Sequence, residues 1–157
     1  MGETAGGPAA RLPAEAWRYL EEHRVAHLAT VDAAGHPSVV PLCYATDGTA
    51  IYSALDDKPK RVPHEELRRV RDIRAHPEVA LVVDDYSEEW AHLAYLLIRG
   101  LAEVLAPGGD EHAHAVALLR ARYPQYRQMP IQERPVIRIQ PLRTRFWRAG
   151  GRPTPPV

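Results

Sequence analysis

The chain is organised around one stretch, Ile51-Tyr52-Ser53-Ala54-Leu55-Asp56-Asp57-Lys58-Pro59-Lys60-Arg61. It begins as an apolar run of strand-forming residues, breaks at two aspartates and then presents three cations in four positions. The sequence has 20 lysine and arginine residues, and the only lysines among them are Lys58 and Lys60. Compact ammonium groups in a turn after a strand are suited to holding a phosphate. The alternative interpretation is a solvated basic loop, which is common on protein surfaces.

Length and composition predict one domain. A chain of 157 residues can bury a core without disulfides, and the single cysteine, Cys43, lies in an apolar run that favours a buried structural thiol. A formal net charge of zero argues against a general nucleic-acid binder. We find neither an apolar run of membrane-spanning length nor a secretion signal, so we expect a cytoplasmic protein with no nucleic-acid or membrane partner. Residues 12–148 are predicted to form the domain, between flexible tails at 1–11 and 149–157 that are rich in Gly, Ala and Pro.

Hydrophobic periodicity and turn residues predict a mainly β protein with helices, of the α+β class. We predict helices at 13–24, 65–75 and 110–122 and strands at 25–31, 37–44, 50–55, 79–83, 93–106 and 135–148. The first three strands are joined by short turns, which predicts an antiparallel meander. The run at 79–83 is typical of a strand covered on both faces, and 93–106 is long enough to be bent or bulged. In the helix at 65–75, Leu67, Val70 and Ile73 are predicted to point inward.

The sequence lacks the common motifs for nucleotide, metal and acyl-transfer chemistry. GxGxxG, GxxxxGKS/T, HExxH and GxSxG are all absent. Histidines that are close in sequence are predicted to point in different directions, so no metal site is expected. Asp84, Asp85, Glu88 and Glu89 resemble paired carboxylates, but a solvated turn between strands is favoured. No catalytic residue can be assigned from the sequence.

The strand that precedes the basic stretch carries a second feature. Its residues Ser38-Val39-Val40-Pro41-Leu42 include a proline, which cannot complete a ladder, so we expect an irregular strand that exposes backbone N–H and C=O groups. Such groups can bind the polar edge of a flat heterocycle. A cluster of cations one strand away from this edge suits a phosphorylated flavin.

Several short motifs follow one another along the chain in a specific order. They are Leu28-Ala29-Thr30-Val31, Gly35-His36-Pro37, Val40-Pro41, Ile51-Tyr52-Ser53, Lys58-Pro59-Lys60-Arg61, Leu67-Arg68 and His76-Pro77-Glu78-Val79. Together they resemble the pyridoxamine-phosphate-oxidase-like split-barrel family over 13–148. Tyr86-Ser87-Glu88-Glu89-Trp90, followed by Arg99-Gly100-Leu101-Ala102, is similar to one branch of this family, the deazaflavin-dependent enzymes.

The resemblance implies a six-stranded antiparallel split β-barrel that forms a homodimer and binds FMN or the deazaflavin coenzyme F-420 at the subunit interface. Carried over by position, the phosphate would be held by Lys58, Lys60 and Arg61 with help from Ser53, and the ring would face Ser38, Val39, Val40 and Pro41. Arg71 of the following helix joins this cofactor-binding set as a further cation. Two departures stand out: Asp72 lies where relatives often have asparagine, and Tyr95-Leu96-Leu97-Ile98 is more aliphatic than expected.

The leading functional hypothesis is an oxidoreductase that uses F-420 or FMN for hydride transfer to a small molecule, because in such families the cofactor carries the chemistry. The alternatives are a non-catalytic carrier of flavin or haem in the same barrel and, less favoured, a single-stranded nucleic-acid surface. Arg68, Arg69, Arg71 and Arg74 give the helix at 65–75 more cation than one phosphate requires, which favours the polyanionic tail of F-420. The alternative for these arginines is a solvated helix face with ordinary Glu-to-Arg pairs.

Overall fold

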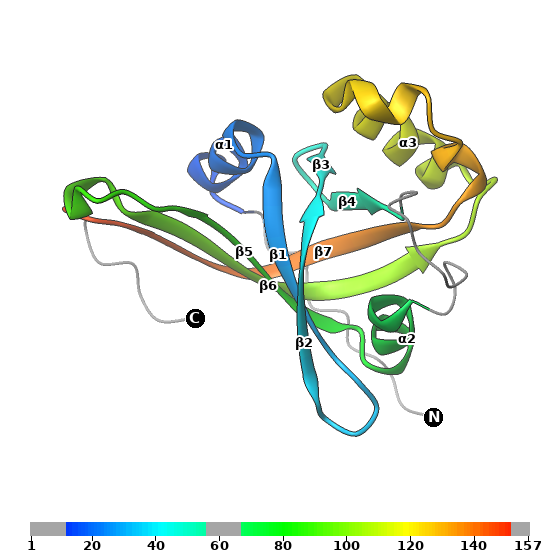
Figure 1. The fold of residues 1–157 in the computed structure, drawn as a ribbon, viewed down its shortest axis with the longest axis horizontal. Coiled ribbons are helices and arrows are strands. Elements are labelled where there is room, and N and C mark those ends of the chain that lie inside the picture. The colour runs from blue at the N-terminus through cyan, green and yellow to red at the C-terminus, as the bar shows by residue number, and fades with distance from the viewer. Residues whose placement is uncertain (1–11, 56–66, 152–157) are drawn as a thin grey trace.

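The computed structural model describes residues 12–55 and 67–151. Within them the chain forms a seven-stranded antiparallel sheet with strand order β2-β1-β5-β6-β7-β4-β3 and three α-helices (Figure 1). The helices are α1 (Ala14–Glu22), α2 (Arg68–Ala75) and α3 (Asp110–Arg122). The strands are β1 (Val25–Val31), β2 (Pro37–Cys43), β3 (Ala45–Thr46), β4 (Ile51–Ala54), β5 (Glu78–Asp85), β6 (Ala94–Leu105) and β7 (Val136–Arg148). Three 3-10 turns complete the described part: η2 (Trp90–His92), η3 (Pro124–Arg127) and η4 (Ile131–Glu133).

The predicted class is confirmed, with seven strands in place of six. The predicted meander is wrong, because β4 pairs with β3 and β7 and not with β2. The cause lies at Tyr44, whose backbone N–H and C=O are both bonded by the hydroxyl of Tyr123, at 3.1 and 2.7 Å. Those backbone groups cannot extend the β1–β2 ladder, so the chain turns away there and starts the short strand β3.

Two hydrophobic clusters hold the sheet. The larger one gathers the inward residues of β1, β5 and β6, such as Leu28, Leu81 and Ile98, beneath α1 and α2. Leu67, Val70 and Ile73 enter this cluster, which confirms the predicted inward face of the second helix. The smaller cluster packs α3, through Val116 and other residues, onto β3 and β4. As expected of a sheet with one face in the core, the strands alternate between buried and exposed side chains.

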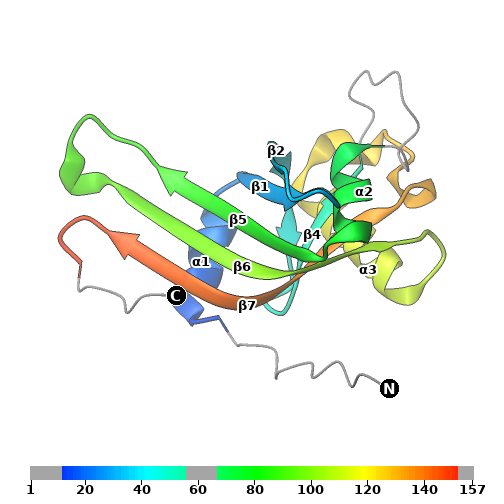
Figure 2. The ribbon, with the colours of Figure 1, turned by 90° about the horizontal axis from the view of Figure 1, so that it is seen from below.

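Strands β5, β6 and β7 extend past the rest of the molecule as a long arm, seen at the left in Figures 1 and 2. The prediction that 79–83 is covered on both faces is wrong for the single chain. Leu81 and Val83 are buried on the inner face, whereas Ala80 and Val82 are only half-buried on the outer face. The outer face also carries Tyr95 of β6, whose ring stacks on that of Trp147 with centroids 5.7 Å apart.

The ladder formed by the strand predicted at 93–106 carries a bulge, but the extra residue, Leu142, lies in β7 and not within 93–106. The β6–β7 register shifts between Arg99 and Gly100, which pair with Arg143 and Pro141. A Cβ atom at Gly100 would lie 2.3 Å from the carbonyl oxygen of Gln140, so only glycine fits beside the bulge.

None of the helices within 12–55 and 67–151 is long and apolar enough to cross a membrane. The predicted flexible tails lie outside the described residues, apart from 149–151.

Candidate functional site

The turn between β1 and β2 is built by Asp32. One oxygen of its carboxylate accepts the backbone N–H groups of Ala34 and His36, each at 2.9 Å, and Gly35 takes the positive φ of 90° that closes the turn. The backbone N–H of His36 lowers the pKa of the Asp32 carboxyl below its usual value. The second carboxylate oxygen, Oδ2, contacts Nδ1 of the His36 ring at 3.2 Å and also faces Arg68 of α2.

Helix α2 lies beside this turn and presents Asp72 to β1. The Thr30 hydroxyl donates to Asp72 Oδ2 at 2.7 Å, and both side chains are buried. Arg68 links the two carboxylates, with Nη2 3.7 Å from Asp32 Oδ2 and Nε 3.9 Å from Asp72 Oδ2. Asp72, the residue that departs from the asparagine common among relatives, is therefore bonded within the fold by Thr30 and Arg68.

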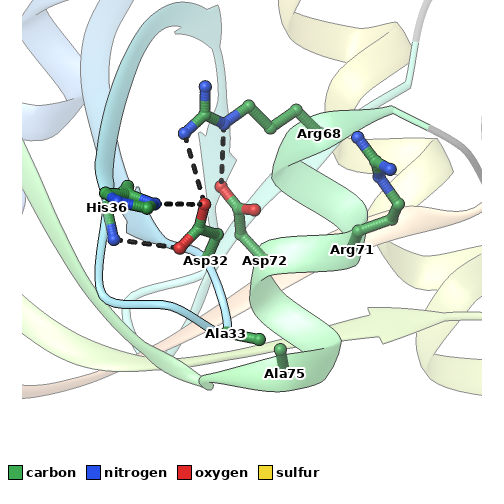
Figure 3. A pocket seen from close by; sticks show the side chains of 7 residues that line it. All are labelled: Asp32, Ala33, His36, Arg68, Arg71, Asp72 and Ala75. Carbon is green, nitrogen blue, oxygen red and sulfur yellow. Dashed lines mark hydrogen bonds and ion pairs between the residues drawn. The ribbon is translucent and has the colours of Figure 1, made fainter.

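The β1–β2 turn and helix α2 form the walls of an open cleft of about 680 Å³ (Figure 3). Its walls are formed by Asp32, Ala33, His36, Arg68, Arg71, Asp72 and Ala75. In Figure 3 the Arg68 guanidinium lies above the two carboxylates, and Arg71 extends separately from the next turn of the helix. We call this cavity the α2 cleft.

The helix arginines differ in what they contact. Arg68 is engaged by two carboxylates, and Arg69 is also partnered. By contrast, no carboxylate of the described residues lies within ion-pair distance of Arg71 or Arg74, which are exposed one turn apart on the same side of α2. Arg71 is thus a wall of the α2 cleft with its charge available to a ligand.

The structure places the four predicted ring-facing residues, Ser38, Val39, Val40 and Pro41, on β2 at the edge of the sheet. The predicted irregularity is wrong, because β2 pairs with β1 in continuous register from Val25↔Cys43 to Val31↔Pro37. An edge strand tolerates Pro41 without a bulge, since a strand with one neighbour does not need every N–H for the ladder. Backbone groups are nevertheless available along β2, because its second edge has no partner strand among the described residues.

Of the other predicted phosphate ligands, only Ser53 lies within the described residues. Ser53 lies on β4, is 3% exposed and donates its hydroxyl to the Cys43 carbonyl at 2.8 Å, which ties β4 to the end of β2. Lys58, Lys60 and Arg61 lie outside the described residues. Of the predicted set, the α2 cleft itself contains Arg71.

Sequence reasoning missed the acidic side of the cleft. Asp32 was expected only in the turn between two strands, His36 only as part of the Gly35-His36-Pro37 motif, and Thr30 only as a strand residue. The signal for Asp32 was present: an aspartate three residues before a glycine, with His36 four residues on, is typical of a side chain that bonds its own turn. No local signal connects Thr30 with Asp72, which is 42 residues away.

A second polar cluster, beside α3, contrasts with the cleft. Arg138 Nε lies 2.6 Å from Glu111 Oε1, which also accepts the Tyr52 hydroxyl at 3.0 Å. Asp47 accepts the N–H groups of Thr49 and Ala50 and contacts His114 at 3.0 Å. Burial and the Glu111 bond raise the pKa of Tyr52 above its ordinary value. We call this group the α3 network.

Within the described ranges, no group of three or more His, Cys, Asp or Glu side chains could hold a metal ion. The α2 cleft offers charge recognition by Arg71, and the open edge of β2, which supplies no residue to the lining of the cleft, offers backbone hydrogen bonding.

Comparison with known proteins places these features in a family. The family model described as pyridoxamine 5'-phosphate oxidase matches residues 12–148. No curated protein matches the sequence. Several solved structures share the fold.

A conserved hypothetical protein from Mycobacterium tuberculosis, Rv2991, superposes with a TM-score of 0.71 and 22% identity, covering 95% of this chain and 93% of that one. The haem storage protein HutZ from Vibrio cholerae gives a TM-score of 0.67 and 18% identity over 90% and 96% of the two chains. A protein described as an F420 reductase superposes with a TM-score of 0.63 and 27% sequence identity, covering 85% of this chain and 98% of that one.

Proposed function

The chain belongs to the pyridoxamine 5'-phosphate oxidase family, and from this premise we propose that it is an oxidoreductase using a flavin-type cofactor, coenzyme F-420 in preference to FMN. Family membership supports binding of a flavin or deazaflavin in a split barrel. The structure described as an F420 reductase, at 27% identity, favours the deazaflavin. Bound to the protein, such a cofactor would supply hydride transfer to a small molecule.

The observation that carries the choice of F-420 is the charge of Arg71. FMN ends in one phosphate, whereas F-420 continues into a polyanionic tail that needs cations beyond the phosphate site. Arg71 lines the α2 cleft with no carboxylate partner in the part of the chain that the structure describes, and Arg74 is equally available one turn further on. Arg68 cannot be counted in the same way, because Asp32 and Asp72 already neutralise it.

The protein's own residues would bind and orient the cofactor. The free edge of β2 offers backbone donors and acceptors to a ring, at Ser38, Val39, Val40 and Pro41. Arg71 would attract the tail, and the basic stretch from Lys58 to Arg61 would hold the phosphate. A site built in this way supplies position and charge complementarity and leaves the electron chemistry to the cofactor.

Calorimetric titration with F-420 and with FMN tests this proposal. We expect F-420 to bind more tightly at low salt, with the difference shrinking as salt screens the tail. Lys60→Ala should weaken both ligands by about tenfold or more, about 1.5–3 kcal/mol for a lost bond to a charged group. Equal or tighter binding of FMN at low salt would place the protein with the FMN users. Binding of haem in place of both ligands would favour the carrier alternative.

We also propose that the protein works as a homodimer. On the outer face of the sheet Val82, Leu97 and Tyr95 are half-buried, and Val39 is 63% exposed. A second copy of the same face would cover this apolar surface. Light scattering at micromolar concentration should give twice the chain mass of 17.6 kDa. A monomeric mass would rule out a site shared between two subunits.

A further inference from the structure

A second cavity lies on the outer face of the sheet, on the other side of the β1–β2 hairpin from the α2 cleft. Its volume is about 520 Å³, and its walls come from β1, β2, β5, β6 and β7. Most of its lining is apolar, including Ala29, Val31, Ala80 and Leu142. The charged residues that line it are Arg99, Arg143 and Glu78. We call this cavity the outer groove.

The two arginines of the outer groove are direct cross-strand partners, Arg99 on β6 and Arg143 on β7. Like charges placed opposite each other on one face destabilise a sheet. Among the described residues, no carboxylate lies within ion-pair distance of either side chain, although Glu78 lines the same groove. The groove therefore holds two adjacent cations whose repulsion no carboxylate of the described residues relieves.

The bulge in β7 creates this pair. Gly100 pairs with Pro141, so a regular ladder would place Leu142 opposite Arg99. The extra residue shifts the register by one and puts Arg143 there instead. The close approach of Gly100 to the Gln140 carbonyl shows that the sequence is adapted to this geometry. Bulges commonly re-aim a side chain next to a ligand site.

A third arginine on the same face has one nitrogen without an acceptor among the described residues. Arg145 follows Arg143 by two residues on β7 and pairs with Leu97. Its Nε atom is buried and has no hydrogen-bond partner within the described residues. Buried donors are nearly always bonded, so this atom calls for an acceptor from outside the described residues, such as a ligand.

We propose that the outer groove binds the carboxylate of a small molecule with an apolar body, and that this molecule is the substrate. Arg99 and Arg143 grip the carboxylate, since guanidinium groups match its two oxygens. The apolar walls cover the body of the ligand. The assignment as substrate rests on the proposed oxidoreductase function, whereas the carboxylate site stands on the groove alone.

The site can be tested with a matched pair of probes, 2-naphthoate and 2-naphthalenemethanol, which share a body and differ in charge. By calorimetry the wild-type protein should bind the carboxylate at least about tenfold more tightly than the alcohol. Arg143→Gln and Arg99→Gln should each remove most of this difference and leave the alcohol unaffected. Arg18→Gln, on the exposed side of α1, removes the same charge elsewhere and should change neither affinity.

Three results would overturn the proposal. The first is equal binding of the two probes by the wild-type protein, which needs no variant to fold. The second is an equal loss of carboxylate affinity in Arg18→Gln, which would indicate net charge only. The third is a change of oligomeric state in Arg143→Gln with probe binding unchanged, which would mean that the arginines pair with a partner subunit's carboxylates.

The same proteins titrated with F-420 separate the two proposals. If wild-type protein binds F-420 but does not prefer the carboxylate, the substrate class is wrong and the proposed function survives. If it prefers the carboxylate but binds no flavin-type cofactor, the proposed function is wrong and the groove remains a carboxylate site.

Discussion

The α3 network and the α2 cleft contain similar residues but use them differently. In the α3 network Arg138 meets Glu111 and Glu103, and Asp47 is bonded by its own turn and by His114. In the α2 cleft one arginine is neutralised by two carboxylates, while its neighbour Arg71 has no carboxylate partner within residues 12–55 and 67–151. A charged residue is therefore recognised as structural or as available to a ligand by the partners of its charge, and not by the presence of the charge alone.

The largest effect should come from the buried pair of Thr30 and Asp72, of which Asp72 lines the α2 cleft. Thr30→Val keeps the shape of the side chain but leaves the buried Asp72 carboxylate without its hydroxyl donor. We expect the free energy of unfolding to fall by about 2–3 kcal/mol, measured by urea denaturation. Asp72→Asn can still accept from Thr30 and should cost less. A loss below about 0.5 kcal/mol in Thr30→Val would show that the bond does not support the fold.

The contrast between the α3 network and the α2 cleft can be tested by replacing one arginine in each region with glutamine. Arg138→Gln should lower the free energy of unfolding by about 1 kcal/mol, since its partners are half-exposed, and leave F-420 binding unchanged. Arg71→Gln should do the reverse: it should weaken the binding of F-420 about fivefold, or by about 1 kcal/mol, and leave the free energy of unfolding unchanged. If both variants lose stability alike, Arg71 is structural and the distinction fails.

The smallest expected effect is the pH dependence contributed by Asp47. Burial raises the pKa of this carboxyl, but bonds from the N–H groups of Ala50 and Thr49 and the Thr49 hydroxyl lower it further, so the net shift is downward. A lowered pKa contributes stability above the unfolded value of 3.8 that is lost as the pH falls below it. Wild type should therefore exceed Asp47→Asn in stability at pH 6, by less than about 1 kcal/mol, and the gap should close on acidification. A gap that stays constant down to pH 2 would contradict this assignment.

Local patterns were enough to predict the helices, most strands and the inward face of α2, whereas the bulge expected in 93–106 lies in the neighbouring strand β7. Pairing between distant segments was not predictable in the same way. The predicted meander is wrong from Tyr44 onward, because the backbone groups of Tyr44 are bonded by Tyr123, 79 residues later. Turn chemistry alone cannot reveal such a competitor.

The candidate site shows the same limit. Arg71 was predicted from the density of cations on one helix, which is visible in the sequence. Asp32 and Asp72 neutralise Arg68 and not Arg71, and this depends on where the fold places the two carboxylates. The juxtaposition of Arg99 and Arg143 depends on one extra residue in β7, and a shift of one residue changes which side chains face each other.

The stacked pair of Tyr95 and Trp147 gives the protein a built-in optical probe. The chain has three tryptophans, of which Trp90 is 72% exposed at the tip of the arm and Trp17 packs against the larger core cluster. Trp147 lies on β7 two residues beyond Arg145, on the face that the groove and the proposed dimer share. In a Trp17→Phe/Trp90→Phe background, the fluorescence of this one indole would follow events on the outer face in real time. A shift of its emission to shorter wavelength on concentration would report subunit docking, and quenching by an added carboxylate would report occupancy of the groove.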